Sequence, residues 1–138
     1  MAWRGSFWCG KFQQNLIALE FNKLKNYTTN SLLGITKESY FEICKGSNAD
    51  PIEEEIPIEY EDLLIDTQYA ILIFNSLSDK WDRFNGVYIG KDYSNIELFL
   101  KIYNIHFEIY TFILRCIKTM EEVNIEYINN KVNKNSGK

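Results

Sequence analysis

The chain has 138 residues, a length that fits one folded domain. Its hydrophobic fraction of 46% and aromatic fraction of 15% can build a core, and 25% charged residues is ordinary, so a wholly disordered chain is excluded. The formal net charge of −4 argues against non-specific binding to nucleic acid, which needs a basic surface. No direct nucleic-acid partner is therefore expected.

The segment at residues 1–35 is predicted to be an N-terminal extension or arm, which either packs on the domain that follows or is appended to it. Apolar residues recur at near-helical spacing from Phe12 to Lys25, and this pattern favours an amphipathic helix within the arm. The polar run from Asn26 to Ser31 is typical of a loop, which would end that helix.

Residues 36–130 are predicted to form a helical domain. Thr36 can cap a short helix that ends at Gly46, since glycine is common just beyond helix C-termini. Two prolines then favour an extended, exposed connector over residues 47–58, because each proline disfavours helix in the residue before it.

A largely buried helix is predicted after the connector, beginning near Tyr60 or at Asp66, because few positions up to Leu77 are polar. Residues 87–89 (Val-Tyr-Ile) have the composition of a short strand. Two pairs of turn-forming residues, Ser78-Asp79 and Asn85-Gly86, precede this segment.

The last third of the chain is predicted to be helical. Ser94 and Glu97 fit the Ser-x-x-Glu capping box that opens a helix. A longer helix is predicted from about Phe107 to Asn129, and residues 131–138, rich in Lys, Asn, Ser and Gly, are predicted to be a flexible tail. The expected fold class is mainly α, a compact bundle of about four to five helices with one short extended segment.

The stretch at residues 86–93 (Gly-Val-Tyr-Ile-Gly-Lys-Asp-Tyr) resembles a phosphate-binding loop at first sight. That motif needs four residues between its glycines and a Ser or Thr after its lysine. Here three residues separate Gly86 from Gly90, and Asp92 follows Lys91. A carboxylate at this place would repel a triphosphate, so nucleotide binding is rejected and no cofactor is expected.

Two interpretations of this loop remain open. In the first, its glycines shape a turn while Asp92 and Ser94 satisfy free amides of the next helix. In the second, the loop is a recognition surface, because aromatic residues beside charged groups are enriched at protein interfaces. The candidate partner-binding residues of the second interpretation are Trp81, Tyr88, Gly90, Lys91, Asp92 and Tyr93, with Phe84 in the same aromatic group.

Acidic residues gather between Lys45 and Lys80, where no basic residue falls. A calcium loop would need alternating oxygen ligands around a central glycine, which this stretch lacks. A glycosidase would need one carboxyl desolvated beside another that stays ionised. The stretch is either a solvated face or a docking site for a basic partner, and its candidate binding residues are Glu53, Glu54 and Glu55.

Catalytic and metal-ligating residues are not predicted. His106 is the single histidine and has no catalytic Ser or Cys implied beside it, so neither a triad nor a metal site follows. Cys9, Cys44 and Cys116 lack metal-ligand spacing and are expected to be reduced thiols of a cytosolic protein. No signal peptide or membrane span is recognisable, so a membrane partner is not expected.

Short motifs from Tyr40 onward resemble those of small uncharacterised proteins encoded by tailed bacteriophages. The matching motifs are Tyr40-Phe41-Glu42-Ile43-Cys44, Glu53-Glu54-Glu55-Ile56-Pro57, Tyr60-Glu61-Asp62, Phe74-Asn75 and Tyr88-Ile89-Gly90-Lys91-Asp92-Tyr93, with the Lys/Ser/Gly tail. The resemblance covers about residues 40–138 and implies a phage origin, without a set of functional residues. Residues 1–39 depart from it, either as a genuine extension or through an upstream start.

The leading hypothesis is a non-enzymatic phage protein that binds other proteins, in head or tail assembly, in the host cytoplasm or in the virion. An alternative is an acidic inhibitor that occupies a basic surface of a host nucleic-acid-processing protein. A small hydrolase that uses carboxylates is the third hypothesis. The identity of the viral or host partner and the oligomeric state do not follow from the sequence.

Overall fold

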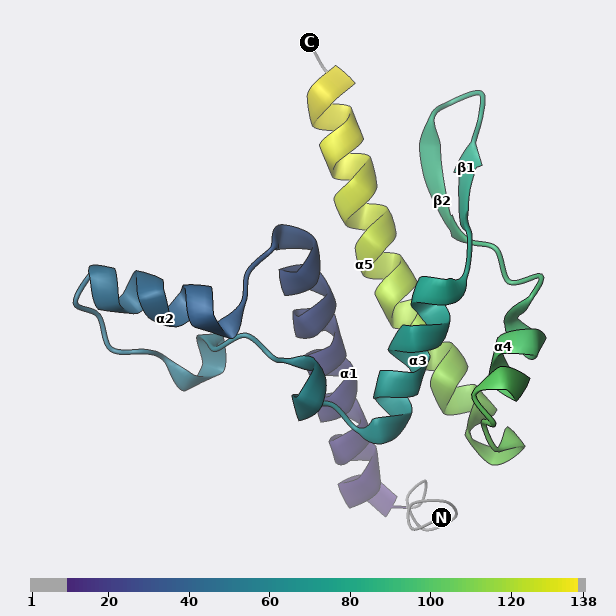
Figure 1. Ribbon diagram of the computed structural model, residues 1–138, viewed down its shortest axis with the longest axis horizontal. Coiled ribbons are helices and arrows are strands. Elements are labelled where there is room, and N and C mark those ends of the chain that lie inside the picture. Colours follow the sequence, from purple (N-terminus) through teal and green to yellow (C-terminus); the bar gives the residue numbers. More distant parts are fainter. Residues whose placement is uncertain (1–9, 137–138) are drawn as a thin grey trace.

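Five α-helices and one two-stranded antiparallel sheet form the described part of the chain, which confirms the predicted mainly α class (Figure 1). The structure is a computed structural model that describes the backbone of residues 10–136 and the side chains of residues 14–131. In chain order the elements are α1 (Gly10–Leu33), α2 (Lys37–Gly46), α3 (Ile65–Ser76), β1 (Asp79–Asp82), β2 (Val87–Lys91), α4 (Ile96–Ile102) and α5 (Tyr110–Ser136), with short 3-10 turns at Glu53–Glu55, Tyr60–Asp62 and Phe107–Ile109.

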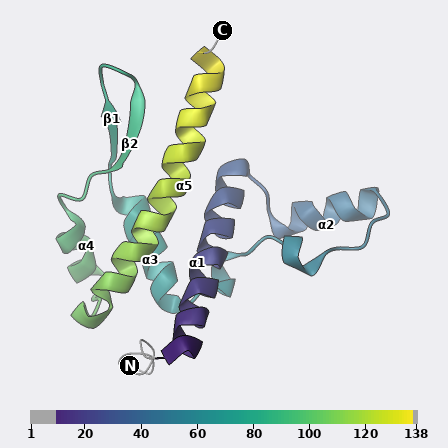
Figure 2. The same cartoon turned by 180° about the vertical axis from the view of Figure 1, so that it is seen from behind.

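The long helix α5 is the axis of the molecule. The helices α1 and α3 pack along it, and the hairpin of β1 and β2 runs beside its C-terminal half (Figures 1 and 2). The helix α4 packs against α3. The buried side chains between these elements form one core: Leu24, Leu63, Ala70, Ile71, Ile73, Phe74, Leu77, Leu100, Ile105, Ile109, Phe112, Ile113, Cys116, Ile117 and Met120.

The first helix is part of this core, so the described part of residues 1–35 packs on the rest of the chain, which was one of the two alternatives for this segment. Leu24 on α1 is fully buried against the core. The helix also continues through the predicted loop, where the Thr28 hydroxyl donates to the Leu24 carbonyl at 2.8 Å. It ends at Gly34, whose φ of +74° is the left-handed conformation that commonly closes a helix. Burial against α5 therefore outweighs the weak helix propensity of Asn and Thr.

The helix α2 projects away from the helices that pack on α5 (Figure 1). Thr36 caps it as predicted, since the Ser39 amide donates to the Thr36 hydroxyl at 3.1 Å. The left-handed residue that follows is Asn48, with a φ of +57°, and not the predicted Gly46. Residues 37–57, which comprise α2 and the chain that returns from it, are called the arm below.

The helix α3 begins at Ile65, close to the second of its two predicted starts, and α1 supplies its cap. The Glu20 carboxylate is buried and accepts from the Leu64 amide at 2.8 Å and from the Thr67 hydroxyl at 2.7 Å. Leu64 occupies the N-cap position, and its own apolar side chain cannot accept a hydrogen bond. A residue 44 positions earlier in the chain therefore satisfies the first amide of α3.

The predicted strand at residues 87–89 is present as β2, and it is not isolated. It pairs with β1, for which no strand was predicted. The predicted capping box is wrong: α4 begins at Ile96, and Ser94 instead donates from its amide and its hydroxyl to the Asp92 carboxylate, at 2.9 and 2.6 Å.

The long C-terminal helix is confirmed, although it extends further than predicted. It reaches Ser136. The prediction of a flexible tail over residues 131–138 is therefore wrong for residues 131–136, which are helical. Cys44 and Cys116 are free thiols and are buried, whereas Cys9 lies outside the described residues. Among the described residues, no helix has the length and apolar character needed to cross a membrane.

Candidate functional site

The hairpin is attached to the body through a buried lysine. The Lys91 ammonium lies 3.0 Å from the Asp79 carboxylate, donates to the Leu77 carbonyl at 3.2 Å, and stands 4.6 Å from the centroid of the Phe74 ring. Its side chain is 9% exposed. Tyr88 completes the group, because its hydroxyl donates to the same Asp79 carboxylate at 2.7 Å. Lys91 and Tyr88 therefore act inside the protein, where they fix the hairpin to α3.

A second contact joins the hairpin to α5. The carboxylate of Glu121 is buried, accepts from the Lys91 amide at 2.7 Å and lies 3.4 Å from the Lys118 ammonium. Gly90 passes directly over it with a φ of +133°, a conformation that residues with a Cβ rarely adopt. The close approach of Gly90 to Glu121 explains why a glycine is needed at this place in β2.

The outer edge of β2 is occupied by a side chain of α5. The Asn129 amide accepts from the Tyr88 N–H at 2.9 Å and donates to the Tyr88 carbonyl at 3.1 Å. Both backbone groups of Tyr88 therefore point away from β1, and Tyr88 and Trp81 form a non-hydrogen-bonded cross-strand pair. Their rings accordingly pack edge to face, with centroids 5.1 Å apart.

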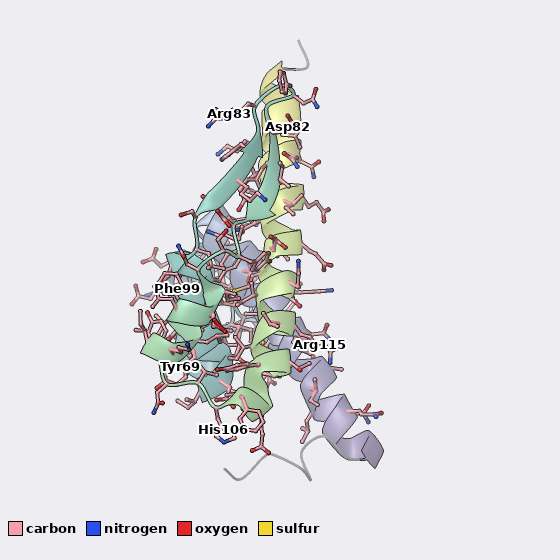
Figure 3. The ribbon with its side chains drawn as sticks, turned by 90° about the vertical axis from the view of Figure 1, so that its right-hand side faces the viewer. Tyr69, Asp82, Arg83, Phe99, His106 and Arg115 are labelled. Atoms are coloured by element: carbon pink, nitrogen blue, oxygen red, sulfur yellow. The ribbon has the colours of Figure 1, made fainter. Side chains whose placement is uncertain are left out.

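The tip of the hairpin is a turn that its own hydrogen bonds hold in shape. The Asp82 carboxylate accepts from the Phe84 amide at 3.0 Å and from the Asn85 side chain at 2.8 Å, and the Gly86 amide donates to the Asp82 carbonyl at 2.8 Å. Figure 3 shows Asp82 and Arg83 at this tip, alongside the C-terminal half of α5. Phe84 is 99% exposed on the turn.

Four apolar side chains of the hairpin are exposed, and together they are called the hairpin surface. They are Trp81 (47% exposed), Phe84 (99%), Val87 (42%) and Ile89 (50%). Val87 and Ile89 alternate with the buried Tyr88 and Gly90, so they lie on the face of β2 that is turned away from α5. Trp81 lies on the opposite face, because it is the cross-strand partner of Tyr88 and its ring packs on the Tyr88 ring. The two faces of β2 are thus divided between attachment to the body and exposure to solvent.

The predicted site residues separate into two groups. Trp81 belongs to the hairpin surface, whereas Tyr88, Gly90 and Lys91 hold the hairpin from within. The interpretation of the loop as a recognition surface therefore applies to Trp81, whereas the interpretation as a structural turn applies to Tyr88, Gly90 and Lys91. Asp92 and Tyr93 are half-buried where β2 leads into α4, and the exposed residues Glu53, Glu54 and Glu55 lie on the arm.

Sequence analysis missed most of the residues that organise this site. Asp79, Glu121 and Asn129 bind the hairpin through contacts that span up to 41 positions in the chain, so no local pattern could mark them. Val87 and Ile89 could have been found, because alternation along a strand with one buried face leaves the intervening residues exposed.

Internal contacts change the acidity of three groups in the hairpin. Burial raises the pKa of Tyr88, and so does its hydrogen bond to Asp79. Burial likewise raises the pKa of Tyr93, whose hydroxyl faces Glu121. Burial raises the pKa of Asp79, but the Tyr88 hydroxyl and the Lys91 ammonium outweigh it, and the net pKa lies below the ordinary value.

The free energy of unfolding is expected to fall as the pH rises above about 10, the ordinary pKa of tyrosine. The folded protein holds the phenol protons of Tyr88 and Tyr93 more tightly than the unfolded chain does, since both pKa values are raised on folding. Their contribution is complete below about pH 10 and is lost above it. Urea unfolding across this range should show a shallower decline in a Tyr88→Phe, Tyr93→Phe variant. A double variant with the wild-type slope would contradict the assignment.

Within the described residues, no group of three or more His, Cys, Asp or Glu side chains is arranged to hold a metal ion. The arrangement that the structure does present is a stiff hairpin with an apolar surface. Comparison of the chain with protein-family models, with curated proteins and with solved structures finds no match.

Proposed function

We propose that this protein is a bacteriophage protein that acts without catalysis, by binding another protein during assembly of the virion head or tail. The observation that carries the proposal is Phe84, an aromatic side chain that is 99% exposed on a turn with a fixed shape. Aromatic residues dominate the binding energy of many interfaces. A fixed turn also reduces the conformational entropy that binding must remove.

The rest of the hairpin surface supports the same proposal. Val87 and Ile89 are roughly half exposed on one face of the hairpin and Trp81 on the other, and exposed apolar side chains of this kind are typical of interaction sites. Lys91 and Glu121 fasten the hairpin to α3 and α5, so it would meet a partner without rearranging first. The proposed location is the host cytoplasm, or the virion if the protein stays bound after assembly.

Mixing the purified protein with the head and tail proteins of its phage should give a complex in size-exclusion chromatography. Phe84→Ser and Trp81→Ser should each weaken the complex about tenfold or more, as expected for aromatic residues at the centre of an interface. The matched control is Phe107→Ser, because Phe107 is 71% exposed but lies outside the hairpin. No complex with any virion protein, or equal loss in the control, would contradict the proposal.

The arm favours a second candidate function, an acidic inhibitor of a host nucleic-acid-processing protein. Its carboxylates at Glu53, Glu54 and Glu55 are exposed, which suits a basic surface on a partner. Binding of this kind should weaken as salt is added and when these residues are changed to glutamine. Binding to a host target that salt does not affect would argue against it.

A further inference from the structure

A pocket of about 410 Å³ lies in the elbow between the end of α1 and the chain that returns from the arm. One wall is the last turn of α1 with the residues that follow it, and the other is the segment at residues 57–61. The elbow pocket exists because α2 turns away from α1 instead of packing along it (Figures 1 and 2). Glu59 and Glu61 are among the residues that line it.

Fixed contacts hold the two walls of the elbow pocket together. The Asn26 side-chain carbonyl on α1 accepts from the Ile58 amide at 3.1 Å. The Lys37 ammonium lies 3.7 Å from both the Glu59 and the Asp62 carboxylates. The first contact joins α1 to the segment at residues 57–61, and the second joins the start of α2 to Glu59 and Asp62.

Aromatic rings form part of the lining. Tyr27 and Tyr60 approach with centroids 6.4 Å apart, and the Tyr60 hydroxyl donates to the Gln68 carbonyl at 3.3 Å. That hydrogen bond keeps the ring in place. Ring faces attract cations, and they also pack well against the flat guanidinium group and the apolar stem of arginine.

The charges around the pocket favour the same class of ligand. Glu59 and Glu61 line the pocket, and both are exposed. Lys37 is the cation in the lining, and its charge is already opposed by two carboxylates. The arm carries three further exposed carboxylates in the 3-10 turn at Glu53–Glu55. A ligand with one positive charge in the pocket and further positive charges along the arm would be matched throughout.

We infer that the elbow pocket binds an arginine side chain from a basic segment of a protein partner, and that the arm carboxylates bind neighbouring basic residues of that segment. The inference rests on the proposed function, because it requires a protein partner. It adds a second surface, distinct from the hairpin surface. The two surfaces project from different sides of the molecule, so one protein could join two partners (Figure 1).

The test is a titration of the isotope-labelled full chain, followed by NMR, with a peptide of alternating arginine and serine. The expected result is a set of shifts centred on the amides of Tyr27, Gly34 and Tyr60, which line the pocket. The same peptide with citrulline in place of each arginine keeps the shape and loses the charge, so it should not bind. Raising the salt concentration should weaken binding of the arginine peptide.

Variants then assign the binding to these carboxylates. Glu61→Gln should weaken the affinity for the arginine peptide about threefold. The triple variant Glu53→Gln, Glu54→Gln, Glu55→Gln should weaken it about tenfold, the range expected for exposed charge pairs. Glu126→Gln is the matched control, because Glu126 is exposed on α5 away from the arm, and it should bind as the wild type does.

Several results would overturn the inference: equal binding of the citrulline peptide, shifts centred elsewhere, or no effect of Glu61→Gln. Shifts of the same amides on raising the protein concentration without peptide would assign the pocket to a second copy of the chain, and would also overturn it. The Phe84→Ser variant should bind the peptide normally. If the arginine peptide did not bind but the complex with virion proteins formed, the inference would fail and the proposed function would stand. If the peptide bound but no such complex formed, the proposed function would fail instead.

Discussion

Replacing Gly90 by valine should lower the free energy of unfolding by about 4 kcal/mol. Strain at the φ of +133° would account for about 1–3 kcal/mol. The new Cβ would also lie 2.8 Å from the Glu121 side-chain carbon Cδ and overlap the carboxylate, which would have to leave the Lys91 amide. An abandoned buried hydrogen bond costs about 1–3 kcal/mol more. Urea unfolding followed by circular dichroism measures the change.

The control for Gly90 is Gly46→Ala, because Gly46 closes α2 with open space around its Cβ position and without a positive φ. It should change the unfolding free energy by less than about 0.5 kcal/mol. A double-mutant cycle separates clash from strain: in a Glu121→Ala background, Gly90→Ala should cost less than it does in the wild type. Equal costs in the two backgrounds would contradict a contact between Gly90 and Glu121.

Replacing Glu20 by alanine should lower the free energy of unfolding by about 2–4 kcal/mol. The change removes the cap that α1 supplies to α3, which is worth about 1–2 kcal/mol. It also leaves the buried Thr67 hydroxyl without its acceptor, at a further cost of about 1–2 kcal/mol. Because the contact joins the N-terminal helix to the middle of the chain, the loss should appear in the global unfolding transition.

Glu20→Gln is the informative partner variant, since its side-chain oxygen can still accept from Leu64 and Thr67. It should recover more than half of the stability that Glu20→Ala loses. Glu97→Ala controls for removal of a carboxylate, because Glu97 is exposed in the first turn of α4. If Glu20→Ala and Glu97→Ala had the same midpoint in urea, the capping role of Glu20 would have to be abandoned.

The fold class could be predicted from the sequence because the longest helices carry their own signal. Apolar residues recur at helical spacing between Phe107 and Asn129, and this segment became α5. The β-branched and aromatic residues at 87–89 likewise marked β2. In both segments the local preference and the tertiary contacts favour the same structure.

The role of α1 could not be predicted, because its buried face mixes apolar and polar residues. Ile17 and Leu24 are buried on that face together with Glu20 and Thr28. The polar members interrupt the apolar stripe that sequence patterns rely on. Their burial is understandable only once their partners are known, and the partners of Glu20 lie on α3.

The strand β1 could not be predicted from its own residues either. Its sequence, Asp-Lys-Trp-Asp, has no alternation and a high charge, so the residues alone do not indicate a strand. It becomes extended because it pairs with β2 and because Asp79 meets Lys91. The exposed candidate Trp81 could be named from its residue type, whereas the burial of Lys91 depends on the hairpin that β1 completes.

The Asn129 amide has a consequence for how the sheet can grow. A β-sheet edge with free N–H and C=O groups is a template for another strand, in fibres as well as in functional complexes. On β2 the central groups of that template, those of Tyr88, are already taken by the side chain of Asn129. A third strand can therefore add only alongside β1, so any sheet built on this protein would extend in a single direction.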